Sequence, residues 1–67
     1  MYRAYNSNGD VFARGKTLEE LGERCIERLL THAIPTLEIL KLQRNDKFLG
    51  AYGGAWNINN ELVLVKL

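Results

Sequence analysis

The sequence predicts a small α+β domain, with a single amphipathic helix packed on one face of a small antiparallel sheet, in the order β-β-α-β-β or β-β-α-β-β-β. Only residues 17–33 show a sustained helical period. Shorter apolar segments precede and follow them, separated by turns that contain asparagine and glycine. The chain has 67 residues, close to the lower limit for folding without disulfides or metals. We therefore expect residues 1–67 to form a single domain.

Residues 2–6 and 11–14 are predicted to form an opening β-hairpin. The pair Asn8-Gly9 between them is typical of a two-residue type I′ turn, because both central positions of that turn need a positive φ. Gly15 and Lys16 then lead into the helix.

The helix is predicted from a stripe of seven apolar residues at helical spacing: Leu18, Leu21, Cys25, Ile26, Leu29, Leu30 and Ala33. Thr17 and Glu20 predict a capping box, in which the hydroxyl accepts from the Glu20 amide and the carboxylate reaches back to the cap amide. Pro35 ends the helix. Gly22 costs roughly 1 kcal/mol relative to alanine in a helix interior. Close approach of a strand or an aromatic ring would offset that cost, and simple tolerance is the alternative.

Two or three strands are expected after the helix. In residues 36–44 the alternation slips at Ile39-Leu40, so either a bulge shifts the phase or both faces of the strand are covered. Residues 48–52 return as a strand, and Gly53-Gly54 is expected to interrupt it.

The last strand, residues 62–67, is apolar on both faces, with Leu62 and Leu64 on one side and Val63, Val65 and Leu67 on the other. One helix covers only one face of a sheet. The second face must be hidden by curling of the sheet, by residues 53–60 or by another molecule. An apolar patch left exposed there would mark an interaction site.

Composition and motifs weigh against several functions. The net charge of +1 provides no long-range attraction for a polyanion. A single cysteine, Cys25, excludes an internal disulfide, and its place on the apolar stripe indicates a core residue. His32 is the only histidine, and no nucleophile elbow, phosphate loop or metal-ligand cluster is present. We expect no enzymatic activity, no catalytic residues, no metal and no cofactor. Without an apolar run near 18 residues or a leader, the chain is predicted to be cytoplasmic, with no membrane span.

The first functional hypothesis is a small protein-interaction module that binds and occludes a partner protein or forms a homodimer. Two aromatic residues flank flexible glycines near the last strand, and such residues often dominate binding energy. The alternative for Trp56 is that it caps the open end of the core. The last strand is also weakly protected against pairing with a partner strand. The predicted partner-binding residues are Tyr52, Trp56, Ile58, Val63 and Val65. Chains of this size suggest an accessory or inhibitor protein of a phage or mobile element.

The second hypothesis is a domain that binds single-stranded RNA or DNA on the open face of the sheet. Basic and aromatic residues interleave outside the helix, where they would neutralise phosphates and stack on bases. The residues assigned to this role are Arg3, Tyr5, Arg14, Lys41, Arg44 and Lys47. The near-zero net charge and the acidic helix weigh against it.

Residues 13–21, Ala-Arg-Gly-Lys-Thr-Leu-Glu-Glu-Leu, resemble the small sheet-plus-helix domains of HicB-type antitoxins, in which a strand leads through G-x-T-x-E-E into the helix. The resemblance implies the same strand-to-helix topology and a protein partner. The Pro-Gly-Cys segment that usually precedes that helix is absent here. The resemblance therefore supports the topology and the class of partner, without assigning the chain to the family.

Overall fold

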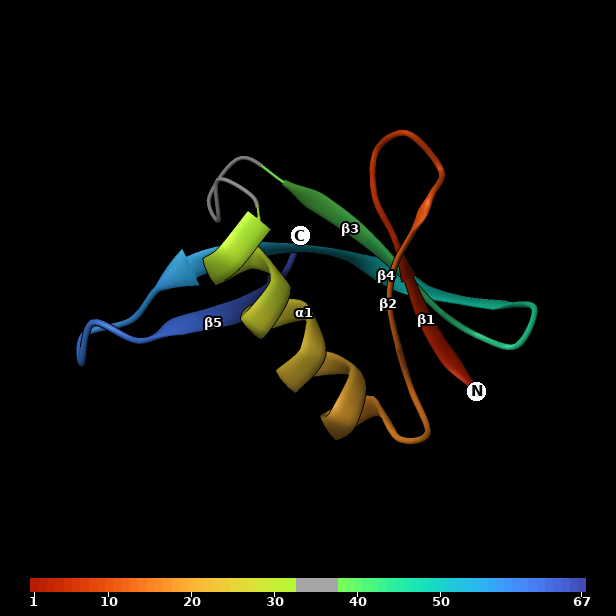
Figure 1. The fold of residues 1–67 in the computed structure, drawn as a ribbon, viewed down its shortest axis with the longest axis horizontal. Helices are drawn as coiled ribbons and strands as arrows, with labels where there is room; N and C mark the ends of the chain where they lie inside the picture. Colours follow the sequence, from red (N-terminus) through yellow and green to blue (C-terminus); the bar gives the residue numbers. More distant parts are fainter. Residues whose placement is uncertain (33–37) are drawn as a thin grey trace.

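The computed structural model describes residues 1–32 and 38–67 and contains one helix on one five-stranded sheet (Figure 1). The elements are β1 (Tyr2–Tyr5), β2 (Val11–Gly15), α1 (Leu18–His32), β3 (Ile39–Arg44), β4 (Lys47–Trp56) and β5 (Leu62–Lys66). The strands are ordered β2-β1-β3-β4-β5, and every neighbouring pair is antiparallel. The predicted α+β class is confirmed, with three strands after the helix. No helix in the described ranges is long and apolar enough to cross a membrane.

The start of α1 is capped nearly as predicted. The Thr17 Oγ1 atom accepts from the Glu20 amide at 3.1 Å. The Glu20 carboxylate, however, accepts from the Lys16 amide at 3.5 Å, one residue before the cap. It also pairs with Arg24 at 3.1 Å, one helical turn away. The carboxylate therefore ties the helix start to its second turn. The predicted Ala33 and Pro35 end of the helix lies outside the described residues.

The core lies between α1 and the sheet, and eight apolar residues fill it: Ala4, Phe12, Leu21, Cys25, Leu29, Leu40, Leu42 and Leu62. Leu21, Cys25 and Leu29 recur every four residues, so they form one narrow line along α1. The predicted stripe was wider than this line, because Leu18 and Leu30 remain about half exposed. Along its 15 residues, α1 fully buries only these three side chains.

The first hairpin turn differs from the predicted type I′ turn. The Asn6 amide donates to the Asp10 carbonyl at 2.9 Å, and the Gly9 amide donates to the Asn6 carbonyl at 3.0 Å. Gly9 alone has a positive φ, of 84°. The turn is thus a three-residue loop that ends in a left-handed residue. The Asn6 side chain stabilises it by accepting from the amides of Asn8 and Asp10, both at 3.0 Å.

The β4–β5 hairpin repeats this turn with a different sequence. Asn57 takes the place of Asn6, and its Oδ1 atom accepts from the amides of Asn59 and Glu61, both at 2.9 Å. Asn60 takes the left-handed position of Gly9, with φ at 61°. Two Asn-x-Asn segments therefore fold in the same way, which the sequence analysis did not predict.

The strand β4 runs without interruption through Gly53 and Gly54, contrary to the prediction. Gly53 pairs with Ile39 on one side and with Val65 on the other. Gly54 pairs with Leu64 of β5. Strand pairing therefore holds these glycines extended, which outweighs their low intrinsic strand propensity. For the slip at Ile39-Leu40 the sequence allowed either a bulge or cover on both faces of the strand. The register of β3 and β4 shifts instead between Leu42 and Gln43. Ile39 and Leu40 simply alternate, with Ile39 48% exposed and Leu40 fully buried.

Gly22 has no compensating close contact. A Cβ atom at this position would have no atom within 4 Å other than those of its chain neighbours and of the backbone of α1 itself. Of the two explanations considered for this glycine, simple tolerance is therefore correct.

Candidate functional site

The face of the sheet opposite α1, which we call the open face, has no described helix or strand over it (Figure 1). Residues paired across antiparallel strands point to the same face, and successive residues alternate. Since Ala4 and Leu42 are buried against α1, their neighbours Arg3 and Gln43 point to the open face. Residues 53–56 belong to the sheet itself and so do not cover it, contrary to one of the expected possibilities.

One half of the open face is apolar and spans β3, β4 and β5. We call it the apolar half; it consists of Ile39, Gly53, Ala55, Val63, Val65 and Leu67. Ile39, Gly53 and Val65 form a row, because Gly53 pairs with both of the others. Ile39 is 48%, Val65 45% and Leu67 70% exposed.

The centre of the apolar half is hollow. Gly53 has no side chain, and a hollow of about 430 Å³ lies over it, bordered by the apolar residues Ile39, Ala55, Val65 and Leu67 and also by Gly54 and the acidic residue Glu38. Leu67 leans toward this point, with its Cδ2 atom 3.6 Å from the place of a Cβ atom on Gly53. The arrangement is a shallow apolar depression that fits one inserted aliphatic or aromatic side chain.

The other half of the open face is basic and lies mainly on β1, β2 and β3. We call it the basic half; it consists of Arg3, Tyr5, Arg14, Lys41, Gln43 and Phe48. Arg14, Arg3, Gln43 and Phe48 form one row across four strands, and Phe48 is 58% exposed. None of the five strands contains an acidic residue, so no strand carboxylate neutralises these cations.

The five predicted partner-binding residues do not share one surface. Val63 and Val65 lie on the open face, whereas Tyr52 and Trp56 lie on the face that carries α1. Tyr52 packs against the core and Trp56 is 49% exposed. Ile58 stands at the tip of the β4–β5 hairpin, 99% exposed. The aromatic pair around the glycines is thus separated from the valines by the sheet.

Four of the six predicted nucleic-acid residues do come together, since Arg3, Tyr5, Arg14 and Lys41 all lie in the basic half. Arg44 and Lys47 pair with each other on the opposite face. The Arg44 guanidinium lies over the Tyr2 ring, 5.7 Å from its centre.

Ile39, Leu67 and Phe48 are exposed site residues that the sequence analysis did not select. For Ile39 a signal existed, because the broken alternation at Ile39-Leu40 placed an apolar residue on each face. For Phe48 no local signal existed. Its face depends on the bulge between β3 and β4, which shifts the pairing by one residue.

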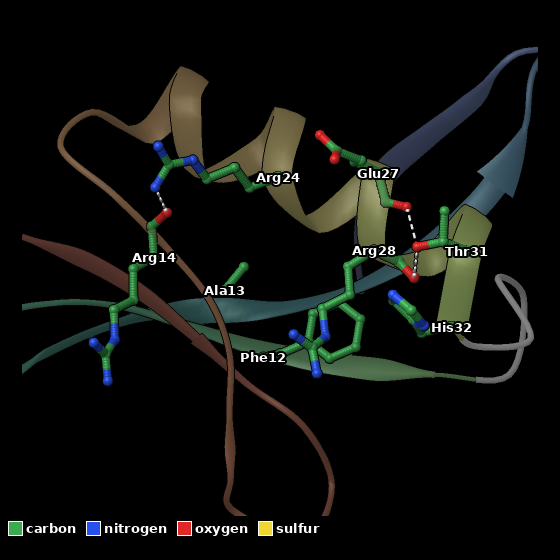
Figure 2. Close-up of a pocket in the computed structure, with 8 residues that line it drawn as sticks. All are labelled: Phe12, Ala13, Arg14, Arg24, Glu27, Arg28, Thr31 and His32. Carbon is green, nitrogen blue, oxygen red and sulfur yellow. Dashed lines mark hydrogen bonds between the residues drawn. The ribbon is translucent and has the colours of Figure 1, made fainter.

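A second hollow, of about 350 Å³, lies between α1 and the edge strand β2 (Figure 2). Arg24 donates across it to the Arg14 carbonyl at 3.0 Å. The Arg28 guanidinium lies over the Phe12 ring, 5.3 Å from its centre. Figure 2 shows the Arg14 side chain pointing away from α1. The arginines that border this hollow therefore fasten the helix to the strand.

The described residues offer little to covalent or metal chemistry. Cys25 is fully buried, and its burial raises the pKa of the thiol to about 11. Such a thiol carries almost no thiolate near neutral pH and is a poor nucleophile. Across residues 1–32 and 38–67, no three His, Cys, Asp or Glu side chains form a group that could hold a metal ion.

Comparisons with protein-family models, curated proteins and solved structures found no match to this chain. The resemblance of residues 13–21 to HicB-type antitoxins therefore gains no support from a family match.

Proposed function

We propose that this chain is a small, non-enzymatic protein-binding module that covers a partner protein with the apolar half of its open face. One observation carries the proposal. Ile39, Val65 and Leu67 are 48%, 45% and 70% exposed and surround the same hollow over Gly53. Contiguous exposed apolar side chains with a central depression are typical of interaction sites. The narrower assignments, to the cytoplasm and to a phage or mobile element, stay predictions.

The surroundings of the apolar half indicate the chemistry of the partner. Burying the remaining exposed area of Ile39, Val65 and Leu67 is worth on the order of 1 kcal/mol for each side chain. Glu38 borders the hollow beside Ile39, and Lys41 lies two positions from Ile39 on β3, so charges of both signs flank the apolar half. The fitting partner presents an apolar side chain for the hollow, flanked by polar groups that complement both Glu38 and Lys41.

Two matched charge variants test this proposal. Ile39→Lys places a charge at the hollow, whereas Leu30→Lys places one at a similarly exposed position on α1, 55% against 48% exposed. Tagged wild-type and variant chains are used to capture proteins from an extract of the source cells, and the captured protein is then purified and titrated. We expect Ile39→Lys to weaken binding about tenfold or more and Leu30→Lys to leave it unchanged. Equal binding by both variants would reject the apolar half as the site.

A second candidate function, binding of single-stranded nucleic acid, is favoured by the basic half. Arg3, Arg14 and Lys41 lie on one face around the rings of Tyr5 and Phe48, on strands without acidic residues. Three phosphate contacts predict a log-log salt slope of about −2 for a single strand. Fluorescence anisotropy with labelled oligo(dT) and oligo(U) measures this slope. No binding at ~20 mM salt would end this candidate, since electrostatic attraction is then greatest.

A further inference from the structure

The two edges of the sheet are protected very differently. The edge strand β2 has a bulge opposite Ala4 and Tyr5, and α1 lies beside it. The Arg24 guanidinium donates a hydrogen bond to the Arg14 carbonyl at 3.0 Å, so this carbonyl of β2 already has a partner. Bulges, charges and covering elements all prevent an edge from pairing with another chain. The opposite edge, β5, pairs with β4 without a bulge, contains no proline and has one charged residue, Lys66.

Two hydrogen bonds establish which backbone groups of β5 face outward. The Asn57 amide donates to the Glu61 carbonyl, and the Leu67 amide donates to the Ala51 carbonyl, both at 2.9 Å. Bonded and non-bonded pairs alternate along an antiparallel ladder. Val63 and Val65 therefore bond to β4, while Leu62, Leu64 and Lys66 direct their N–H and C=O groups away from it.

The burial of each residue determines which of the outward N–H and C=O groups of β5 a second strand can reach. Leu62 is only 7% exposed, Leu64 is partly buried and Lys66 is exposed. The accessible outward groups are thus those of Leu64 and Lys66, which flank Val65. Val65 is itself 45% exposed on the open face. This pattern is symmetric about Val65, as an antiparallel pair of identical strands requires.

We infer that β5 pairs antiparallel with β5 of a second copy of this chain, with Val65 opposite Val65 on the two-fold axis. Leu64 of each copy then exchanges two backbone hydrogen bonds with Lys66 of the other. The two five-stranded sheets then form a single ten-stranded sheet, with both helices on the same side of it. On the other side the rows Ile39, Gly53 and Val65 of the two copies become one continuous apolar row. Four hydrogen bonds and a short contact predict a weak dimer that forms with rising concentration.

Cysteine cross-linking tests this arrangement. The Cα atoms of the two Val65 residues, as a non-bonded antiparallel pair, would be about 4.5 Å apart, which a disulfide spans. Ile39→Cys is the matched control, because Ile39 lies in the same row with similar exposure, 48% against 45%. In the joined sheet the two Ile39 residues are five strand spacings, about 24 Å, apart. The native Cys25 is buried and does not compete.

We expect Val65→Cys to form a disulfide-linked dimer under mild oxidation about tenfold faster than Ile39→Cys. Equal rates, or a faster reaction of Ile39→Cys, would overturn edge pairing, and the latter result would indicate contact between open faces instead. Failure of Val65→Cys to dimerise over a wide concentration range would also overturn it.

Two substitutions at Lys66 test the backbone contact without altering the open face. Lys66→Pro removes the outward N–H, which β4 does not use, and proline is tolerated at such edge positions. Lys66→Ala removes the side chain and keeps the N–H. By light scattering on a sizing column, we expect Lys66→Ala to dimerise and folded Lys66→Pro to remain monomeric. A dimer of Lys66→Pro would contradict the pairing. This inference is independent of the proposed partner binding, because Ile39→Lys should weaken partner binding and leave the dimer intact.

Discussion

The backbone of Gly15 lies directly against the backbone of Leu21, so that a Cβ atom on Gly15 would be only 2.5 Å from the Leu21 amide nitrogen. This contact joins the end of β2 to the first turns of α1. By contrast, a Cβ atom on Gly50 or Gly53 would meet flexible side chains first. Since backbone on both sides cannot yield as a flexible side chain would, only glycine fits here.

Gly15→Ala should therefore destabilise the fold. A methyl group at 2.5 Å from a backbone nitrogen must push β2 and α1 apart, at a cost of about 2 kcal/mol or more. Urea unfolding measures the loss. A change within ~0.5 kcal/mol of wild type would show that the two segments separate freely.

Gly22→Ala should have the opposite effect. A methyl group at Gly22 meets no atom of another strand or side chain within 4 Å, apart from its chain neighbours, and alanine is favoured over glycine in a helix by about 1 kcal/mol. The free energy of unfolding should rise by roughly that amount. A decrease would mean that this glycine has a packing role that the structure does not show.

The two asparagine turns provide a prediction with an internal control. Asn57→Ala removes the oxygen that accepts from the amides of Asn59 and Glu61, and should lower the free energy of unfolding by about 1 kcal/mol. Asn59→Ala is the matched control in the same turn and should stay within ~0.5 kcal/mol of wild type. Equal effects of both substitutions would argue against the side-chain acceptor.

Cys25 predicts a pH dependence of stability. Burial raises the pKa of its thiol from 9.0 to about 11, so the folded chain keeps a proton that the unfolded chain releases. The protonated thiol therefore makes its full contribution to the free energy of unfolding below pH 9, and this contribution is lost as the pH rises from 9 to about 11. Cys25→Ala lacks this titration. Between pH 9 and about 11, the free energy of unfolding of the wild type should therefore fall relative to that of Cys25→Ala. A difference that stays constant over this range would show that the Cys25 thiol is not buried in the folded chain.

The helix and the three hairpins are predictable from the sequence because they rest on local signals: the helical period, the cap at Thr17 and the turns that contain asparagine, although the type of the first turn was not correctly predicted. The continuity of β4 through Gly53 is not, since pairing on both sides overrides the preference of glycine. The site is predictable only in part. That β5 is apolar on both faces follows from the alternation of Val63 and Val65 with leucines. Whether Tyr52 or Phe48 lies on the same face of the sheet as Val65 depends on strand register and on one bulge, and no local sequence pattern specifies either.

The most direct test asks whether the apolar half of the open face serves the fold or a partner. It measures the free energy of unfolding of Ile39→Lys by urea titration, at a concentration where the chain is monomeric. Ile39 is 48% exposed and lies outside the buried core. The value should lie within ~0.5 kcal/mol of wild type, as for other surface positions. A loss of about 2 kcal/mol or more, typical of a core position, would show that Ile39 supports the fold and would contradict its assignment to a binding surface.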